Sequence, residues 1–416
     1  MFADQPAHRG LLLLELLHAG PSGEGKPGSG PEGGAWGSIT TLARAHGVAP
    51  LLHERLQTSG VLATLPDSAQ AILVAARRTA AFENLRHYAE FRRISDAFNR
   101  RGIPLMALKG LHLAEQVYGD ISLRPMSDMD ILVPESRVAE AVAAMQTLDY
   151  GPDGDLSGSI RKMLESKCNL GFAHRRHDVY VEVHWKLSEP GSPYAAPMNE
   201  IWQSARPAQL GAGDTRVMSP EFLLLYVCAH LACNHVFSLN LRALYDVAAI
   251  IGRVPGLDWA RFVRQATSHG WHRGVAVVLR LAHDNLGVAV PDRVLDALGA
   301  GALDATLLGD ALEHILSGPE FPRALVTAPN VVNLSGQELR AKVATVWRRV
   351  FVAPAELALL YGIPERSLRL PLWYAVRLRD LLRKYMRSVW AMEIADPRIA
   401  ALAARQVRLA KWVAGP

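Results

Sequence analysis

The chain has 416 residues, of which 50% are hydrophobic and 20% are charged. That length exceeds one small domain and that apolar content excludes a disordered chain, so we expect two or three folded domains. Three cysteines are too few for a disulfide framework, and no cleavable signal peptide is recognisable, which together favour a reducing, cytoplasmic environment.

The net charge of +5 is unevenly distributed. From Arg366 to the C-terminus, eleven Lys or Arg residues stand against three acidic ones, which gives this tail a charge of +8 (11 − 3). A solvated helical face explains the tail best, and binding of nucleic acid or of an anionic membrane surface is the less favoured alternative. The apolar run at 11–17 is too short for a transmembrane segment and predicts a packed helix.

Residues 1–102 are expected to form an N-terminal helical region. Gly, Pro and Ser dominate 20–34, which predicts a mobile loop, and 36–65 is typical of two short helices. A long helix should begin near Asp67, with that side chain as its cap, and end near Gly102. Its buried face is predicted from apolar residues at helical spacing: Leu85, Tyr88, Phe91, Ile94 and Phe98.

From residue 103 the pattern changes and predicts a small β-sheet. The run 105–108 suits a buried strand, followed by a short helix that Gly110 opens. A second strand is expected at 131–133, with a helix after it.

Two further strands, 169–173 and 179–185, are predicted to pair across a polar turn. Ser219 is predicted to cap the first of a series of helices that continues over 219–416, with an interruption near 317–335. The fold class is therefore α+β: a small mixed β-sheet flanked by N-terminal helices and followed by a mostly α-helical C-terminal domain.

Three acidic residues are placed to act together. Asp128 and Asp130 lie two apart at the mouth of a buried strand, so their side chains project to one face and could reach metal ions about 3.5 to 4 Å apart. Glu182 and His184 share the polar face of an otherwise hydrophobic strand, where a carboxylate needs a cation, a metal or solvent. Because Mg²⁺ prefers oxygen ligands, we predict that Asp128, Asp130 and Glu182 bind two Mg²⁺ ions, with Mn²⁺ as the alternative.

Residues upstream of the acids suit phosphate. Lys109 and Gly110 end a strand and open a helix, where backbone N–H groups and an ammonium can meet phosphate oxygens. Arg124 and Ser127 directly precede the acids, and the arginine either contacts phosphate bidentately or pairs with Asp128 and orients it.

These motifs together resemble a known family. The string LMALKGLHLAEQVYGDISLRPMSDMDILV, followed by VEVHW, is similar to the uncharacterised bacterial nucleotidyltransferase family of the DNA-polymerase-β-like superfamily. A Lys-Gly turn, an Arg-Pro, a D-x-D strand and a Glu-x-His-Trp strand recur there in this order. The resemblance covers about residues 36–260, and it departs from the wider superfamily at Lys109-Gly110, where a Gly-Ser pair is usual.

The resemblance implies a polymerase-β-like catalytic core at 103–218 that binds a nucleoside triphosphate such as ATP through Lys109, Gly110, Arg124 and Ser127. The implied reaction transfers the nucleoside monophosphate to a hydroxyl or other nucleophile of an unknown acceptor, and pyrophosphate leaves. His184 is then a second candidate base beside Glu182.

For His230, helix packing is the favoured explanation, and a role as a base or at the acceptor site is the alternative. It clusters in sequence with Cys228, Cys233 and His235, but these positions do not converge on one helix face, so we set a zinc site aside.

Two other functions compete with nucleotidyl transfer. A metal-dependent glycosyltransferase that uses a nucleotide-sugar also carries a D-x-D on a strand, but such folds place strands before that motif, whereas residues 1–102 are predicted as helices. A non-catalytic nucleotide-binding module is the other alternative, and the presence of all three acids counts against it.

Overall fold

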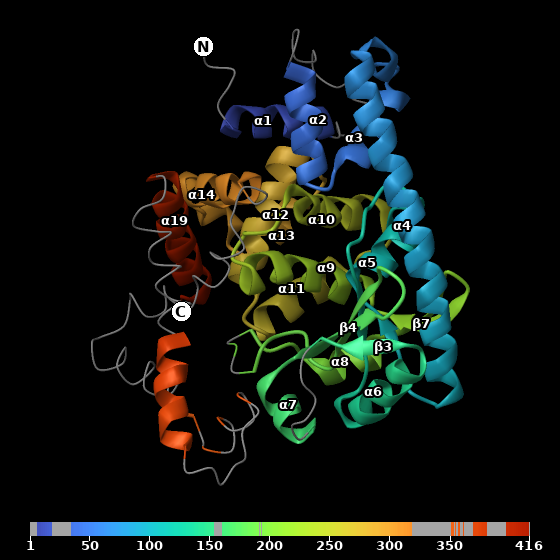
Figure 1. The fold of residues 1–416 in the computed structure, drawn as a ribbon. Helices are drawn as coiled ribbons and strands as arrows, with labels where there is room; N and C mark the ends of the chain where they lie inside the picture. Colours follow the sequence, from blue (N-terminus) through green and yellow to red (C-terminus); the bar gives the residue numbers. More distant parts are fainter. Residues whose placement is uncertain are drawn as a thin grey trace. The chain divides into compact units, whose positions relative to one another are not determined.

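The computed structural model describes residues 6–18, 35–153, 160–190, 192, 194–317, 351, 352, 354, 357, 361, 369–380 and 397–415 (Figure 1). The chain divides into two compact units. The larger is made of Met1–Leu156 and Ile160–Pro319, and the smaller of Ser157–Ser159 and Glu320–Pro416. The three-part domain division expected from the sequence stays a prediction.

The N-terminal part of the larger unit is helical, as the sequence predicts. Its elements are α1 (Pro6–Leu17), α2 (Ala35–Ala45), α3 (Ala49–Thr58), the 3-10 turn η1 (Leu62–Thr64) and α4 (Asp67–Arg100). The predicted loop at 20–34 lies outside the described residues. The helix α2 begins at the next residue, Ala35.

Two expectations for α4 are wrong. Pro66 is the N-cap and Asp67 is already the first helical residue, so its side chain makes no cap hydrogen bond, although the Gln70 amide does reach back to the carbonyl of Leu65. Leu85 is 60% exposed, whereas Tyr88, Phe91, Ile94 and Phe98 are buried as predicted. Leu85 is exposed because the buried face of α4 passes through its neighbour Asn84, which is fully buried, and then through Tyr88 and Phe91.

A seven-stranded mixed sheet forms the centre of the larger unit, in the order β3-β4-β5-β2-β1-β7-β6. Two pairs, β2 with β5 and β1 with β7, are parallel, and the other neighbours are antiparallel. The strands are β1 (Met106–Ala107), β2 (Met129–Leu132), β3 (Tyr150–Pro152), β4 (Asn169–His174), β5 (Tyr180–His184), β6 (Arg206–Leu210) and β7 (Gly213–Val217). A mixed sheet among helices confirms the predicted fold class at this level.

Short helical elements connect the strands. They are α5 (Lys109–His112), the π-helix η2 (Leu113–Val117), the 3-10 turn η3 (Glu135–Arg137), α6 (Val138–Thr147), α7 (Ile160–Ser166) and α8 (Met198–Ser204). The hairpin of β6 and β7 was not predicted, because β6 has the sequence RPAQL, with a proline and no β-branched residue.

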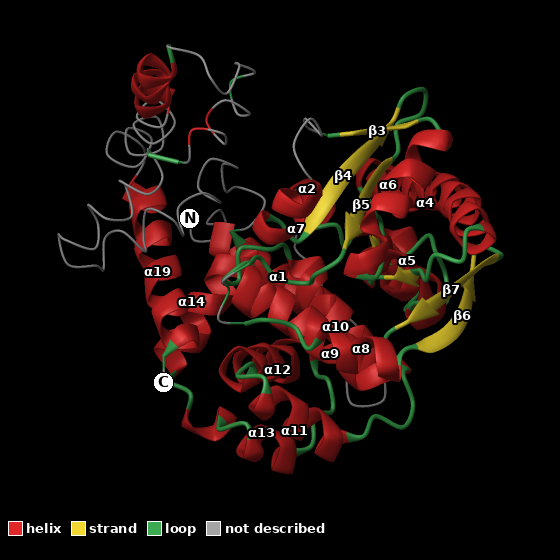
Figure 2. Ribbon diagram, turned by 90° about the horizontal axis from the view of Figure 1, so that it is seen from below, coloured by secondary structure: helices red, strands yellow, loops and turns green. Residues whose placement is uncertain are grey.

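One face of the sheet forms the main hydrophobic core. The helices α4 and α6 lie beside the sheet (Figure 2), and their buried side chains form one cluster with alternate residues of the strands. These strand residues include Met129, Ile131, Val181 and Val183, each at most 1% exposed. Since side chains alternate along a strand, the residues between them face the opposite side.

The rest of the larger unit is a helical bundle, as predicted from Ser219, whose hydroxyl caps α9 by accepting from the N–H of Phe222. Its elements are α9 (Pro220–Ala229), the π-helix η4 (His230–Asn234), α10 (Leu241–Arg253), α11 (Trp259–Ser268), α12 (His272–Leu286), α13 (Asp292–Ala297), the 3-10 turn η5 (Ala300–Ala302) and α14 (Ala305–Leu316).

In the smaller unit, residues 370–380 and α19 (Pro397–Ala414) are helical. Residues 318–335 of the predicted interruption and residues 381–396 of the basic tail lie outside the described residues. Within the described part of the chain, no helix is both long enough and apolar enough to cross a bilayer.

Candidate active site

The parallel pairing of β2 with β5 brings two of the predicted acids together. Asp130 lies directly opposite Glu182 in the register, and Leu132 lies opposite His184. The neighbours of these residues are in the hydrophobic core, so Asp130, Glu182 and His184 share the polar face of the sheet.

Asp130 is the most enclosed member of this group, at 6% exposure. Its Oδ2 lies 3.0 Å from Nζ of Lys109, and its Oδ1 lies 3.0 Å from Nε2 of His184. Burial alone would raise the pKa of the carboxyl group, but the lysine charge and the hydrogen bond from His184 lower it far below its ordinary value. Asp130 is therefore a carboxylate at neutral pH.

His184 bridges two acids. Its Nε2 is also 3.1 Å from Oε2 of Glu182. Burial would lower the pKa of the imidazole, but the hydrogen bonds to Asp130 and Glu182 raise it to about 9. His184 thus carries a proton at neutral pH in this arrangement, which gives the cluster a second cation beside Lys109.

Glu182 has a further partner that the sequence did not point out. The amide Nδ2 of Asn169 donates to Oε2 of Glu182 at 2.6 Å. Asn169 opens β4 and lies opposite His184 in the antiparallel register, so the strand pairing would have indicated it. Asn169 fixes the orientation of the Glu182 carboxylate.

Asp128 lies at the entrance of β2, where the hydroxyl of Ser127 donates to its Oδ1 at 3.1 Å. Burial and the charge of Asp130 raise the pKa of Asp128. The ligand atoms that lie within 4.8 Å of one another belong to Asp130, Glu182 and His184. Asp128 is outside that tight group, and the predicted set of metal ligands stays a prediction.

Lys109 begins α5, directly after β1, and its Nζ lies 3.3 Å from Nε2 of His230 and 6.0 Å from the ring centroid of Tyr226. Burial would lower the pKa of Lys109, but the charge of Asp130 raises it above its ordinary value. For His230, burial and then the lysine charge lower the pKa well below its ordinary value. A neutral imidazole therefore faces the ammonium.

His235 is a second imidazole here, with its ring centroid 4.4 Å from that of His230. Burial lowers the pKa of His235 to about 4, and the charge of Lys109 adds to that effect. The two histidines flank a π-helical turn, and Val236 and Phe237 follow it with φ values of 45° and 61°. Such backbone conformations are unfavourable for branched and aromatic residues, so packing must hold this turn in place.

Gly110 is buried beside the segment that leads to the acids. A Cβ atom there would lie 2.9 Å from Sδ of Met126. The close approach explains why a residue without a side chain stands at this position. Nucleotide binding by Gly110 and Ser127 stays a prediction.

Arg124 does not contact Asp128. Its Nε and Nη2 donate to the two carboxylate oxygens of Asp246 on α10, each at 2.8 Å, and the Arg124 residue is 6% exposed. The hydroxyl of Tyr118 also donates to Asp246, at 2.9 Å, and the Tyr118 side chain is buried. This pairing could not be predicted from residue spacing, because 122 residues separate Arg124 from Asp246.

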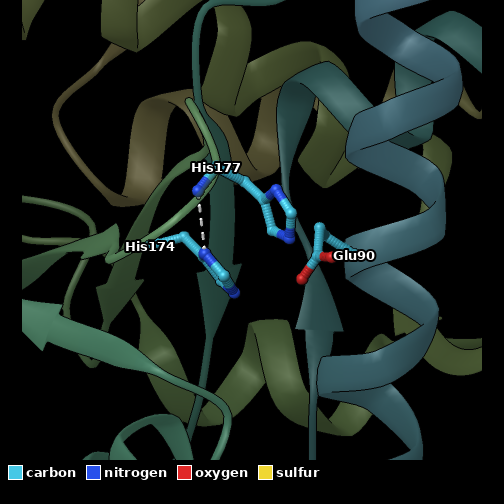
Figure 3. Close-up of side chains that lie close together, drawn as sticks. All are labelled: Glu90, His174 and His177. Carbon is cyan, nitrogen blue, oxygen red and sulfur yellow. Dashed lines mark hydrogen bonds between the residues drawn. The ribbon is translucent and has the colours of Figure 1, made fainter.

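A second group of possible metal ligands lies away from this site, where Glu90 of α4 meets His174 and His177 (Figure 3). Glu90 already accepts hydrogen bonds from Arg93 and Tyr150. Nδ1 of His174 accepts from two backbone N–H groups of the following turn at 3.1 Å, so the proton of a neutral ring sits on Nε2. That nitrogen then has no lone pair for a metal, and we assign none to this group.

Comparison with curated proteins gives no match. Among solved structures, the solution structure of the antibiotic-resistance factor ANT(2'')-Ia matches with 17% identity and a TM-score of 0.26, and the match covers 56% of this chain and 94% of that one. A family model described as uncharacterised nucleotidyltransferase matches residues 32–287, which include every residue of the site above. This match spans more than half of the chain, which therefore belongs to the uncharacterised nucleotidyltransferase family.

Proposed function

We propose that this protein is a Mg²⁺-dependent nucleotidyltransferase that moves a nucleoside monophosphate from a nucleoside triphosphate to a hydroxyl or other nucleophile of an acceptor. The observation that carries the proposal is the parallel register of β2 and β5, which sets Asp130 opposite Glu182 with Asp128 two residues upstream. Membership in a nucleotidyltransferase family supports the reaction type.

The residues fit divalent cations. Three carboxylates face one lysine ammonium and one protonated imidazole, so the protein's own cations leave negative charge uncompensated. Oxygen donors are the ligands that Mg²⁺ and Mn²⁺ prefer. Asp128, Asp130 and Glu182 would hold two such ions, which when bound neutralise phosphate oxygens and lower the pKa of an acceptor hydroxyl.

The chain's own groups have distinct roles in the proposed reaction. The acceptor oxygen attacks the α-phosphorus, the bond from that phosphorus to the bridging oxygen breaks, and pyrophosphate leaves with the bond electrons. Glu182 accepts the acceptor's proton, because its carboxylate is partly exposed, whereas Nε2 of His184 is buried and held between Asp130 and Glu182. The ammonium of Lys109, which forms an ion pair with Asp130, would bind a phosphate oxygen.

The neutral imidazole of His230, the first residue of η4, lies 3.3 Å from the ammonium of Lys109. We propose that it contacts the acceptor or the triphosphate. Gly110 would contact the nucleotide through its backbone N–H and Ser127, which bonds to Asp128, through its hydroxyl group.

The test is a measurement of pyrophosphate release with ATP, GTP, CTP and UTP, each with Mg²⁺, in the presence of fractionated small molecules and protein extracts as acceptors. We expect turnover with at least one triphosphate, and loss of it in Asp128→Asn/Asp130→Asn. Glu90→Gln, which alters a buried carboxylate outside the site, should keep the activity. If none of the four triphosphates binds or reacts, the proposal is wrong.

A further inference from the structure

The segment that connects η2 to β2 leads directly into the acids and is held from two sides. From α4, Nδ2 of Asn84 donates to the carbonyls of Ile121 at 2.6 Å and Arg124 at 2.8 Å. From α10, Nη1 of Arg242 donates to the carbonyl of Pro125 at 2.6 Å. These are bonds to backbone oxygens, so they fix the path of the chain and not only a side chain.

The ion pair of Arg124 with Asp246 is the strongest of these attachments. It is bidentate, with both hydrogen bonds at 2.8 Å, and the two side chains are 7% and 6% exposed. A bidentate pair between a planar guanidinium and a carboxylate restricts both distance and direction, unlike an apolar contact. The hydroxyl of Tyr118, at the start of the same segment, donates to the same carboxylate.

The ion pair also contacts the part of the chain that carries Lys109. A Cβ atom on Gly110 would lie 3.4 Å from Nη1 of Arg124, so the guanidinium packs against the turn that carries Lys109. One buried group thus contacts both the first turn of α5, which carries Lys109, and the segment that leads to Asp128 and Asp130.

We propose that Arg124 is a positioning residue: its ion pair with Asp246 holds the segment entering β2, so that α10 sets the placement of Asp128 and Asp130. The inference rests on the proposed function only in that those acids are taken to bind metal. Arg124 itself does not touch the nucleotide, because its guanidinium is enclosed and paired.

A matched control exists in the same molecule. Glu90 is also a buried carboxylate, at 7% exposure, that accepts hydrogen bonds from an arginine, Arg93, and a tyrosine, Tyr150. It contacts β3 and β4 and not the segment before β2. Glu90→Gln therefore reports what the loss of a comparable carboxylate does elsewhere.

The experiment uses the full chain and two readouts. The first is hydrogen exchange of the amides of Ser122 and Leu123, whose N–H groups bond to Asp120 within the segment. The second is the dissociation constant of Mn²⁺ alone, by calorimetric titration. The variants are Asp246→Asn, which keeps the side-chain shape, and Arg124→Met/Asp246→Leu/Tyr118→Phe, which removes the three mutually bonded side-chain groups together.

In both variants we expect the two amides to exchange about tenfold faster or more, while the amides of β2 stay protected. Mn²⁺ binding should weaken by about 10- to 100-fold, as is usual when a supporting group behind a metal ligand is lost. Arg124→Lys should weaken it less, and Glu90→Gln should change neither readout.

Unchanged exchange in the triple variant would overturn the inference, because the ion pair would then not hold the segment. Faster exchange with an unchanged Mn²⁺ affinity would overturn it as well, since the segment would then not place the acids. If the unaltered protein binds no Mn²⁺, the metal-dependent function fails, and the exchange rates alone still decide whether the ion pair holds the segment.

Discussion

At the scale of single residues, Lys109 is the cation that compensates the buried charge of Asp130. Its ammonium lies 3.0 Å from Asp130 and faces a neutral imidazole on its other side. A buried carboxylate without its cation is strongly unfavourable, and here three carboxylates depend on two cations.

We expect Lys109→Met to destabilise the metal-free protein by about 3–5 kcal/mol, because Asp130 loses its buried partner. Millimolar Mn²⁺ should recover part of that loss, since a bound cation stabilises the folded state that binds it. Urea denaturation with and without Mn²⁺ measures both effects. Lys186→Met is the control, because its ammonium is one-third exposed and pairs with the partly exposed Glu135. Equal destabilisation with and without metal would contradict this account.

At the scale of elements, side-chain alternation in β5 and the D-x-D spacing in β2 made the acidic face predictable, since both patterns are local. Arg124 was different. Whether it would meet phosphate, Asp128 or another group depends on which helix lies across from it, and residue spacing carries no information about Asp246 on α10. The hairpin of β6 and β7 escaped prediction for a related reason: its stability comes from pairing with β1 and packing on α4, and not from strand-forming residues.

Another contact between distant elements gives a pH dependence. His46, which follows α2, is fully buried, and its Nδ1 accepts from the N–H of Leu241 at the start of α10 at 3.2 Å. Burial lowers the pKa of His46 from 6.5 to about 4. Between these values the unfolded chain binds more protons than the folded one, so this contribution to stability is complete above pH 6.5 and is lost as the pH falls toward 4.

The difference in unfolding free energy between pH 7 and pH 5 should therefore be smaller in His46→Leu than in the unaltered chain, by roughly 2 kcal/mol. Urea denaturation at the two pH values gives the comparison, and the loss of packing in the variant cancels because each protein is compared with itself. An identical pH dependence in both proteins would show that His46 binds its proton equally well in the folded and unfolded chains, which would contradict this prediction.

At the scale of the whole molecule, every residue assigned to the site lies in the larger unit, and the family match ends at residue 287 within it. The helix α14 follows that point but belongs to the same unit, where Leu316 packs against Gly10 of α1. A chain that ends after residue 317 therefore keeps this packing.

We expect the chain 1–317 to bind Mn²⁺ with the affinity of the full-length protein, because none of the proposed ligands or their partners has been removed. Circular dichroism establishes that the shorter chain is folded, and calorimetry measures the affinity. Asp130→Asn in the shorter chain is the control and should abolish binding. A folded 1–317 chain without Mn²⁺ affinity would mean that the smaller unit contributes to the site.

The parallel pairing of β2 with β5 also affects how the protein folds and which substitutions its core tolerates. The two strands are separated by α6, β3, α7 and β4, so no tight turn sets their alignment, and the pair can close only after a long excursion of the chain. A slip of one residue would turn Asp130 or Glu182 into the hydrophobic core. The apolar residues on the core side of these strands therefore fix the register of β2 against β5. A polar substitution at Met129 or Val181 would disturb that register and impair the chemistry on the opposite face, although neither residue touches a reacting group.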